Sequence, residues 1–240
     1  IIYVGYDELE KSIDGGNSWN TITNNETNGG KIDEIAVSKS NPAVLYFSDG
    51  PNLYTTSNVG GWNNISNGLP YKTIKYIAIH PADPDKVWIT FSGYTVGEKV
   101  YKSTNGGSSW QNISGTLPNI PINTIVLDET SNLETLYIGT DLGVFTTDST
   151  VSDWSGFNNN SLPNVIVSEL EIQYQSNKLL ASTYGRGLWS IDLLITSPPS
   201  ANFFASDSMF CNIPATVDFT NTSYYSNSYY WDFGDGNTST

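Results

Sequence analysis

Hydrophobic residues in this chain fall into short β-type runs and not into helical spacing. The best-formed stretch places four such runs in succession, at 122–127, 135–139, 144–147 and 154–157. Short runs rich in Val, Ile, Thr, Tyr and Phe, bounded by Gly, Asn and Pro, are typical of β-strands. The same order of runs occurs over residues 74–113 and 32–65. The pattern therefore predicts an all-β chain with three complete groups of four antiparallel strands.

Four tryptophans mark the period of this pattern. They lie at positions 19, 62, 110 and 154, with spacings of 43, 48 and 44 residues. A period in the forties fits a four-stranded β-propeller blade. Residues 1–23 supply the last strands of an earlier blade, and residues 165–194 supply three strands of a final one. We expect part of a larger propeller, completed by sequence before Ile1. A β-sandwich is the alternative, which the long period and the repeated tryptophans disfavour.

Two turn segments in register with this period share one pattern, a Ser, an Asp or Asn, two Gly and a Trp. The defining residues are Ser12, Asp14, Gly16 and Trp19 in the first segment, and Ser103, Asn105, Gly107 and Trp110 in the second. The Asp or Asn can accept hydrogen bonds from its own turn, the glycines can take positive φ, and the tryptophan can pack on the sheet. We interpret the motif as a structural device that closes a hairpin. Segments 55–62 and 147–154 lack its Asp-Gly-Gly core, so looser turns are expected there.

These two segments resemble the Asp-box, or BNR repeat, of the propeller superfamily that includes sortilin-type and xyloglucanase-like domains. The resemblance covers roughly residues 1–194, and the stretch 181–190 is similar to the last-blade signature of secreted multidomain surface proteins of Bacteroidetes. Sialidases and xyloglucan hydrolases carry such boxes as well. The resemblance implies a propeller in which the boxes themselves do no chemistry.

A second module follows the repeats. A Pro- and Ser-rich linker at 196–200 separates the propeller part, residues 1–195, from residues 201–240. The run from Trp231 to Gly236 resembles the opening of a PKD domain, so the module is expected to be the N-terminal half of an Ig-like β-sandwich. Asp232 and Asp235 are candidate calcium ligands, although solvated turn carboxylates explain them better. No other metal or cofactor is expected, and the single Cys211 cannot form an intrachain disulfide.

Charge and composition indicate a secreted or cell-surface protein. The chain has 10 Lys and Arg against 24 Asp and Glu, a net charge of -14, which disfavours binding to nucleic acid or to anionic membrane surfaces. No segment approaches the roughly 18 apolar residues of a membrane helix. Residues 148–150 and 207–209 resemble an O-glycosylation signal of exported Bacteroidetes proteins, which makes Ser149 and Ser208 glycosylation candidates. N-x-Ser sequons begin at Asn64, Asn112 and Asn159.

The sequence offers little catalytic chemistry. The single His80 excludes a His-based triad or a His-rich metal site, and the single Arg186 falls short of the arginines that a sialidase needs. Turns between second and third strands are expected on one propeller face together with exposed aromatic residues. The candidate binding residues of this face are Asp7, Asp49, Tyr71, Tyr94, Asp141 and Arg186.

Because the turn carboxylates recur at equivalent blade positions, turn formation explains them better than catalysis. We expect no catalysis within these residues, and predict that the face binds a glycan or an extracellular protein, since rigid blades present variable loops at little ordering cost. Two alternatives stay open. One is an accessory or partly catalytic propeller of a secreted glycoside hydrolase or peptidase, and the other is a spacer in a surface filament.

Overall fold

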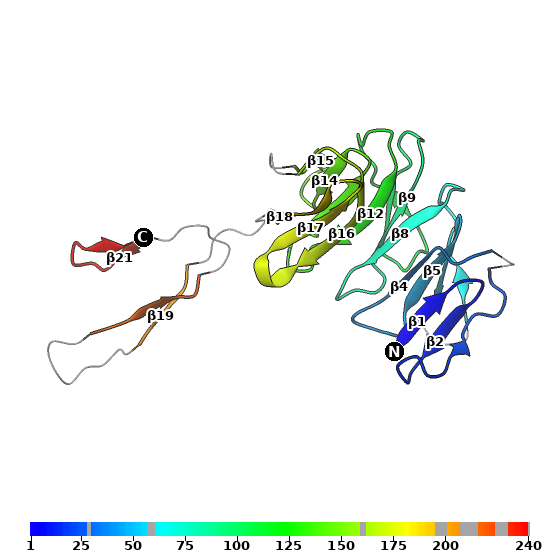
Figure 1. Ribbon diagram of the computed structural model, residues 1–240, viewed down its shortest axis with the longest axis horizontal. Helices are drawn as coiled ribbons and strands as arrows, with labels where there is room; N and C mark the ends of the chain where they lie inside the picture. The colour runs from blue at the N-terminus through cyan, green and yellow to red at the C-terminus, as the bar shows by residue number, and fades with distance from the viewer. Residues whose placement is uncertain are drawn as a thin grey trace. The chain divides into compact units, whose positions relative to one another are not determined.

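The computed structural model describes residues 1–27, 30–56, 61–158, 162–194, 201–206, 216–223 and 230–239. The chain divides into two compact units, Ile1–Leu193 and Leu194–Thr240. All strand pairs in the described residues are antiparallel, which confirms the predicted all-β class (Figure 1).

In the first unit, three four-stranded sheets have their strands in chain order, as the pattern predicted. Sheet B contains β4 (Glu34–Val37), β5 (Leu45–Asp49), β6 (Asn52–Thr56) and β7 (Asn63–Asn64). Sheet C contains β8 (Ile74–Ile79), β9 (Val87–Phe91), β10 (Val100–Ser103) and β11 (Gln111–Asn112). Sheet D contains β12 (Ile122–Leu127), β13 (Leu136–Thr140), β14 (Gly143–Thr147) and β15 (Ser155–Gly156).

Two three-stranded sheets flank these three along the chain. Sheet A contains β1 (Ile2–Gly5), β2 (Leu9–Ser12) and β3 (Asn20–Thr21). Sheet E contains β16 (Val167–Gln173), β17 (Lys178–Thr183) and β18 (Gly187–Asp192), with a single 3-10 turn, η1 (Tyr174–Ser176), between its first two strands. Sheet E therefore has the three strands expected of the final group.

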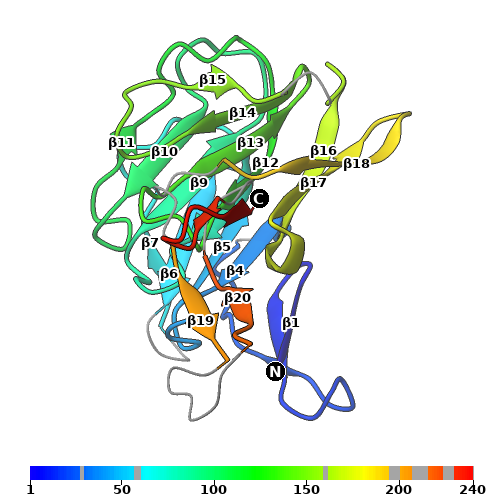
Figure 2. The ribbon, with the colours of Figure 1, turned by 90° about the vertical axis from the view of Figure 1, so that its left-hand side faces the viewer.

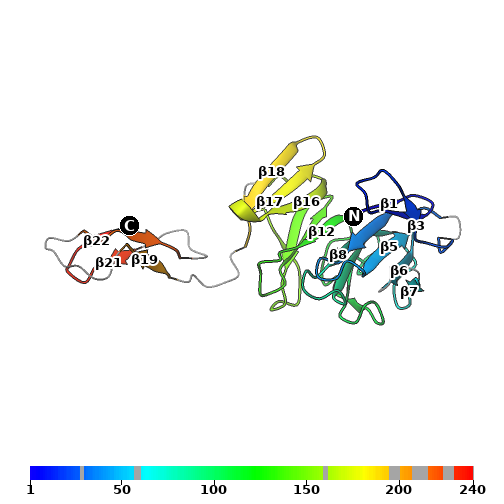
Figure 3. The same cartoon turned by 90° about the horizontal axis from the view of Figure 1, so that it is seen from below.

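The first strands of sheets B to E pack against one another in sequence, β4 on β8, β8 on β12 and β12 on β16. The outer strands β7 and β11 lie on the other side of the unit (Figure 2), and the sheets follow one another from β1 to β18 (Figure 3). Hydrophobic clusters fill the spaces between neighbouring sheets. This arrangement of successive sheets, with first strands inside and fourth strands outside, is that of propeller blades.

Neighbouring sheets approach closely at two glycines, one in β13 of sheet D and one in β1 of sheet A. A Cβ atom added to Gly139 in β13 would lie 2.7 Å from Val167 Cγ1 of sheet E. A Cβ atom added to Gly5 in β1 would lie 2.6 Å from Cγ2 of Ile32, just before β4. Both contacts are closer than van der Waals packing permits, so these positions need glycine.

The tryptophans of the repeat join each sheet to the one before it. Nε1 of Trp62, Trp110 and Trp154 donates to the carbonyl oxygens of Ile22, Ile65 and Ile113, at 2.8, 2.9 and 2.7 Å. Each acceptor directly follows the outer strand of the preceding sheet. Trp19 differs, because its Nε1 donates to Gly16 O of its own turn at 3.1 Å and its side chain is 38% exposed.

The two turns that share the Ser, Asp/Asn, Gly-Gly and Trp pattern, named here the box turns, share two hydrogen bonds between backbone and side chain. The serine hydroxyl accepts the N–H of the second glycine at 2.8 Å, from Gly16 to Ser12 and from Gly107 to Ser103. Oδ1 of Asp14 and of Asn105 accepts the N–H of the serine four residues later at 2.9 Å. Hydrogen bonds from Ser18, with that from Ser12 next, hold the pKa of Asp14 well below its usual range. The turn therefore forms with either an acid or an amide.

The second unit contains two strand pairs among its described residues. β19 (Phe203–Ala205) pairs with β20 (Phe219–Asn221), and β21 (Trp231–Asp232) pairs with β22 (Thr238–Ser239). The rings of Phe203, Phe219 and Trp231 contact one another, yet both phenylalanines stay largely exposed.

The two candidate calcium ligands of this unit have local partners. Oδ1 of Asp232 accepts the N–H of Gly234, and Oδ1 of Asp235 accepts the N–H of Asn237, both at 2.9 Å. No group of three or more His, Cys, Asp and Glu residues that could hold a metal ion occurs in the described parts of the chain. Calcium binding and the PKD resemblance remain predictions.

Candidate functional site

Five turns lie at the end of the sheets where the first strands begin. They join the second and third strands of sheets B to E and, in sheet A, the strands β1 and β2. They comprise residues 6–8, 50–51, 92–99, 141–142 and 184–186, named here the hairpin face. Backbone hydrogen bonds connect these turns with the residues that precede or begin the first strands. Ile32 N donates to Tyr6 O at 2.7 Å, and Ile74 N donates to Gly50 O at 2.9 Å. The box turns lie at the opposite end of the sheets because the strands are antiparallel.

Asp49, one of the predicted face residues, lies beneath the surface. It is only 8% exposed, and a Cβ atom added to Gly30 would lie 2.8 Å from its Oδ1, so the chain before sheet B covers the carboxylate. Burial raises the pKa of Asp49, opposed by a hydrogen bond from Asn52. Asp49 therefore supports the face from below and is not available to a large ligand.

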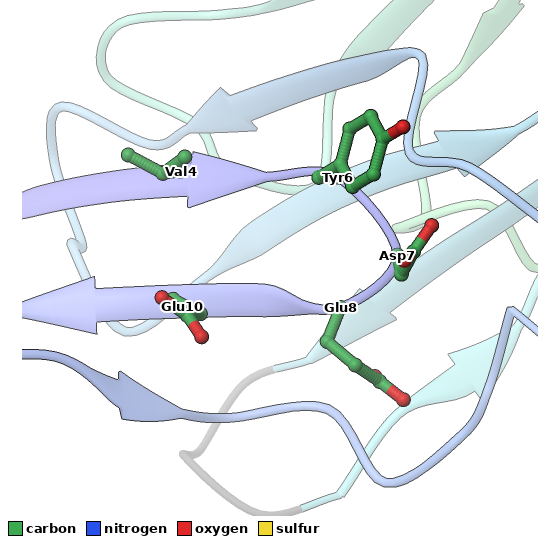
Figure 4. Close-up of a pocket in the computed structure, with 5 residues that line it drawn as sticks. All are labelled: Val4, Tyr6, Asp7, Glu8 and Glu10. Carbon is green, nitrogen blue, oxygen red and sulfur yellow. The ribbon is translucent and has the colours of Figure 1, made fainter.

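Asp7 lines a shallow hollow of about 310 Å³ in sheet A, together with Val4, Tyr6, Glu8 and Glu10. Val4 and Glu10 are cross-strand partners on β1 and β2, and the other three lie in the turn between them (Figure 4). Lys31 Nζ lies 4.4 Å from the centroid of the Tyr6 ring and donates to the Tyr6 hydroxyl at 2.7 Å. The aromatic ring at this position already has a cation from its own chain.

The connection between β9 and β10 is the long one on this face. It has eight residues, 92–99, whereas the corresponding connections have two in sheets B and D and three in sheets A and E. It carries Tyr94, which is 68% exposed, and Val96, which is also exposed. A long loop in one repeat of an otherwise regular array is a common place for a binding function.

This loop is anchored at both ends. Lys99 is fully buried, and its Nζ donates to Gly93 O at 2.6 Å. Asn112 Nδ2 donates to Gly97 O at 2.6 Å. Lys72 forms an ion pair with Glu98 and thereby joins the loop to the segment that carries the exposed Tyr71. Burial, with the nearby Lys72 ammonium as a smaller cause, lowers the pKa of Lys99. The anchors hold Tyr94 out from a fixed base.

Tyr94 meets a carboxylate from the next sheet. Its hydroxyl lies 3.4 Å from Asp141 Oδ2, and Asn123 Nδ2 donates to Asp141 Oδ1 at 3.1 Å. The same amide nitrogen donates to Val167 O of sheet E at 3.1 Å. Two of the predicted face residues, Tyr94 and Asp141, are therefore brought together, with Asn123 orienting the carboxylate.

A second cluster of polar side chains lies on the first strands of sheets B to E. Its members are Glu34, Tyr76, Thr124 and Glu169. The register of β12 and of β16 shifts by one residue just before Thr124 and just before Glu169, as it does in β8 before Tyr76. Such bulges redirect side chains. Thr124 Oγ1 of sheet D donates to Glu169 Oε1 of the neighbouring sheet E at 2.8 Å. Burial, and next the charges of Glu169 and Glu34, raise the pKa of Tyr76 far above its usual range.

Glu34 of sheet B belongs to this group. Burial first, and the Glu169 carboxylate second, raise its pKa to about 7, and the Lys75 ammonium opposes them. The Glu169 carboxylate of sheet E thus acts on Glu34 of sheet B although two sheets, C and D, lie between them along the chain. The sequence signal that could have found them is a Glu near the start of a first strand, where the other two first strands have Tyr76 and Thr124.

The remaining predicted residues are dispersed. The Arg186 side chain is exposed, with no ion pair among the described residues, and its carbonyl accepts Nε1 of Trp189 at 2.9 Å. Ser149 is exposed and Asn64 lies on an exposed outer strand. The Asn112 amide is already bonded to the long loop, so a glycan there would break an anchor. Ser208, Asn159 and Cys211 lie outside the described residues.

No protein-family model and no curated protein matches the chain. Solved structures do match. A GH74 enzyme of Niastella koreensis aligns with a TM-score of 0.58 and 20% identity, over 76% of this chain and 32% of the enzyme. The extracellular domain of a putative one component system of B. thetaiotaomicron aligns with a TM-score of 0.61 and 16% identity, over 79% of this chain and 24% of that domain. A chain of the nidogen/laminin complex aligns with a TM-score of 0.57 and 14% identity, over 79% of this chain and 72% of that chain.

These identities are low, and the chain spans about a quarter to a third of the length of the GH74 enzymes it matches. No helix in the described residues is long and apolar enough to cross a membrane. With the chain-ordered, four-stranded sheets, the structural likeness establishes that the first unit has a β-propeller fold.

Proposed function

We propose that this chain is a non-catalytic recognition module of an extracellular or cell-surface protein, and that the hairpin face binds a glycan or a protein. The observation that carries the proposal is the long loop of sheet C. It holds an exposed tyrosine beside an oriented carboxylate, Asp141, through the buried anchor Lys99. A side chain held in place before binding loses little entropy on binding, and an aromatic ring supplies a large contact area.

The neighbouring structures support an extracellular setting. They include an extracellular domain of a putative one component system and a complex of nidogen with laminin. The acid excess of the chain and its low content of charged residues agree with this setting. In this reading the box turns are structural and Ser149 is an exposed glycosylation candidate.

The test is a binding screen of the 240-residue chain against a glycan array and a panel of purified extracellular matrix proteins. We expect at least one ligand whose affinity falls at least tenfold in the Tyr94→Ala variant and is unchanged in Trp19→Phe, at the box end. Ligands that bind both variants equally well would contradict recognition by the hairpin face.

The second candidate is a glycoside hydrolase activity, and one observation favours it. The pKa of Glu34 is raised to about 7 by burial and then by Glu169, and glycoside hydrolysis uses a pair of carboxyl groups of which one has a raised pKa. GH74 enzymes among the structural neighbours agree with it. Release of reducing ends from xyloglucan or another polysaccharide, abolished in both Glu34→Gln and Glu169→Gln, would establish this activity and displace the first proposal.

A further inference from the structure

The hairpin face contains three tyrosines, Tyr6, Tyr94 and Tyr184, and their surroundings differ. Tyr6 has an ammonium group at its ring, because Lys31 Nζ lies 4.4 Å from the ring centroid. Tyr94 is more than two-thirds exposed. No cation at the Tyr94 ring occurs among the cation–ring contacts of the described residues, which involve Tyr3, Tyr6 and Trp88. Among the described residues the face thus shows one tyrosine ring already holding a cation, Tyr6, and two open rings, Tyr94 and the 78% exposed Tyr184.

A carboxylate lies beside the Tyr94 ring. Asp141 takes part in none of the five ion pairs found in the described ranges of the chain. Its Oδ1 accepts the Asn123 amide and its Oδ2 is turned toward the Tyr94 hydroxyl at 3.4 Å. Each carboxylate oxygen can accept more than one hydrogen bond, so Asp141 retains capacity for a charged donor.

Two exposed apolar side chains belong to the same elements. Val96 lies two residues from Tyr94 in the anchored loop, and Leu142 follows Asp141 in the turn of sheet D. Long basic side chains have an apolar stem and a charged end, and they bury the stem on such groups while the end meets an anion or an aromatic ring.

The net negative charge of the chain also favours a cationic ligand. Acids exceed bases by 24 to 10, so the field around the chain attracts cations and repels anions. Glu98 in the loop is already paired with Lys72, whereas Asp141, beside the ring, has no ion pair among the described residues. Charge complementarity therefore favours a cationic partner over a neutral or acidic one.

We propose that the Tyr94–Asp141 site binds a lysine or arginine side chain presented by a basic segment of an extracellular protein. The proposal rests on the recognition function proposed above and names its partner. The cation lies against the Tyr94 ring and donates to Asp141, and the stem packs on Val96 and Leu142. Lys99 is a positioning residue, since it holds the base of the loop at Gly93.

The probe is a penta-lysine peptide with blocked termini, and its control is the same peptide with all five side chains acetylated. Binding to the 240-residue chain is measured by titration calorimetry at 50 and 300 mM NaCl. We expect binding of penta-lysine only, about tenfold weaker at the higher salt because ions screen exposed charges. Asp141→Asn is expected to weaken binding about tenfold, and Tyr94→Leu, which keeps an apolar side chain without the ring, about threefold to fivefold.

The matched control is Asp148→Asn. It removes the same charge from the turn between β14 and β15, at the box end of the same sheet. If Asp141→Asn weakens binding no more than Asp148→Asn does, the attraction is general and the proposed site is wrong. Folding of each variant is checked by circular dichroism, and Asn123→Ala, which frees the carboxylate without changing its charge, gives a second test with an expected loss of about threefold.

The outcomes also separate this inference from the function on which it rests. A neutral oligosaccharide that needs Tyr94, with no binding of penta-lysine, would overturn the basic-segment proposal and leave the recognition function standing. If the Tyr94 and Asp141 variants bind every probe of the glycan and protein screen as well as the unchanged chain does, both are contradicted.

Discussion

The turns at the two ends of the propeller sheets differ in how closely they follow the repeat. At the box end, Ser12 to Trp19 and Ser103 to Trp110 share two hydrogen bonds from backbone N–H groups to side chains, although one segment contains Asp and the other Asn. At the hairpin end, the connections vary from two residues to eight, and the longest carries an exposed tyrosine. Uniform turns that satisfy their own polar groups indicate structure, whereas departure from the repeat indicates function. Substitutions at the two ends should therefore affect different properties.

The largest effect is expected at the box end, for Trp110→Ala. Its indole packs against the cluster between sheets B and C and donates to Ile65 O, so the change should lower the free energy of unfolding by about 3 kcal/mol. Trp19→Ala, whose indole bonds within its own turn, should cost less than about 1 kcal/mol. Urea unfolding followed by circular dichroism measures both. Equal losses would show that the contact between sheets is not what the tryptophan contributes.

The second effect separates turn conformation from close packing. Gly16 and Gly107 both have positive φ, so an Ala at either position has similar backbone strain. A Cβ atom at Gly107 would lie 2.4 Å from Ile65 Cδ1, whereas at Gly16 the nearest atom is 3.6 Å away, in Trp19. Gly107→Ala should therefore be about 1–2 kcal/mol more destabilising than Gly16→Ala. The same urea experiment checks the difference, and a difference near zero would contradict the packing argument.

The third effect concerns pH and the hairpin end of the first strands. Glu34 has a pKa raised from 4.5 to about 7, so the fold favours its protonated form. Its contribution to stability is complete below pH 4.5 and is lost as the pH rises to 7. Because the group is still partly solvated, the loss should be about 1–2 kcal/mol. Thermal unfolding at pH 5 and pH 8 should show a smaller change for Glu34→Gln than for the unchanged chain, and an identical change would contradict the assignment.

The smallest effect on stability is expected for Tyr94→Ala. The side chain is exposed and its hydroxyl contact with Asp141 is long, so the free energy of unfolding should change by less than about 0.5 kcal/mol. Hydrogen exchange of residues 92–98 should also stay close to that of the unchanged chain, because the Lys99 and Asn112 anchors remain. A clear loss of stability would mean that the residue has a packing role instead of a binding role.

Local features of this molecule were predictable from the sequence. The tryptophan period and the turn-bounded runs gave the four-stranded groups because each blade is formed by consecutive strands. The spacing from Ser103 to Trp110 indicated a hairpin-closing turn because the hydrogen bonds of the Ser103 and Asn105 side chains lie within eight residues. The expectation that second-to-third turns share one end followed from antiparallel order alone.

Features that depend on packing between sheets were not predictable. Asp49 was expected on the face, but the chain near Gly30 covers it. The meeting of Asn123, Asp141 and Tyr94 depends on how sheets C and D are placed, and the influence of Glu169 on Glu34 spans 135 residues of sequence. Lys99 resembles any other lysine in the sequence, although its side chain is buried in the fold.

The recognition role of the hairpin face is tested most directly by one affinity ratio. The dissociation constant of the best ligand from the glycan and protein screen is measured for Tyr94→Ala and for Trp19→Phe. The account predicts at least a tenfold increase for the hairpin-end variant and no change for the box-end variant. Equal constants for both variants and the unchanged chain would contradict it.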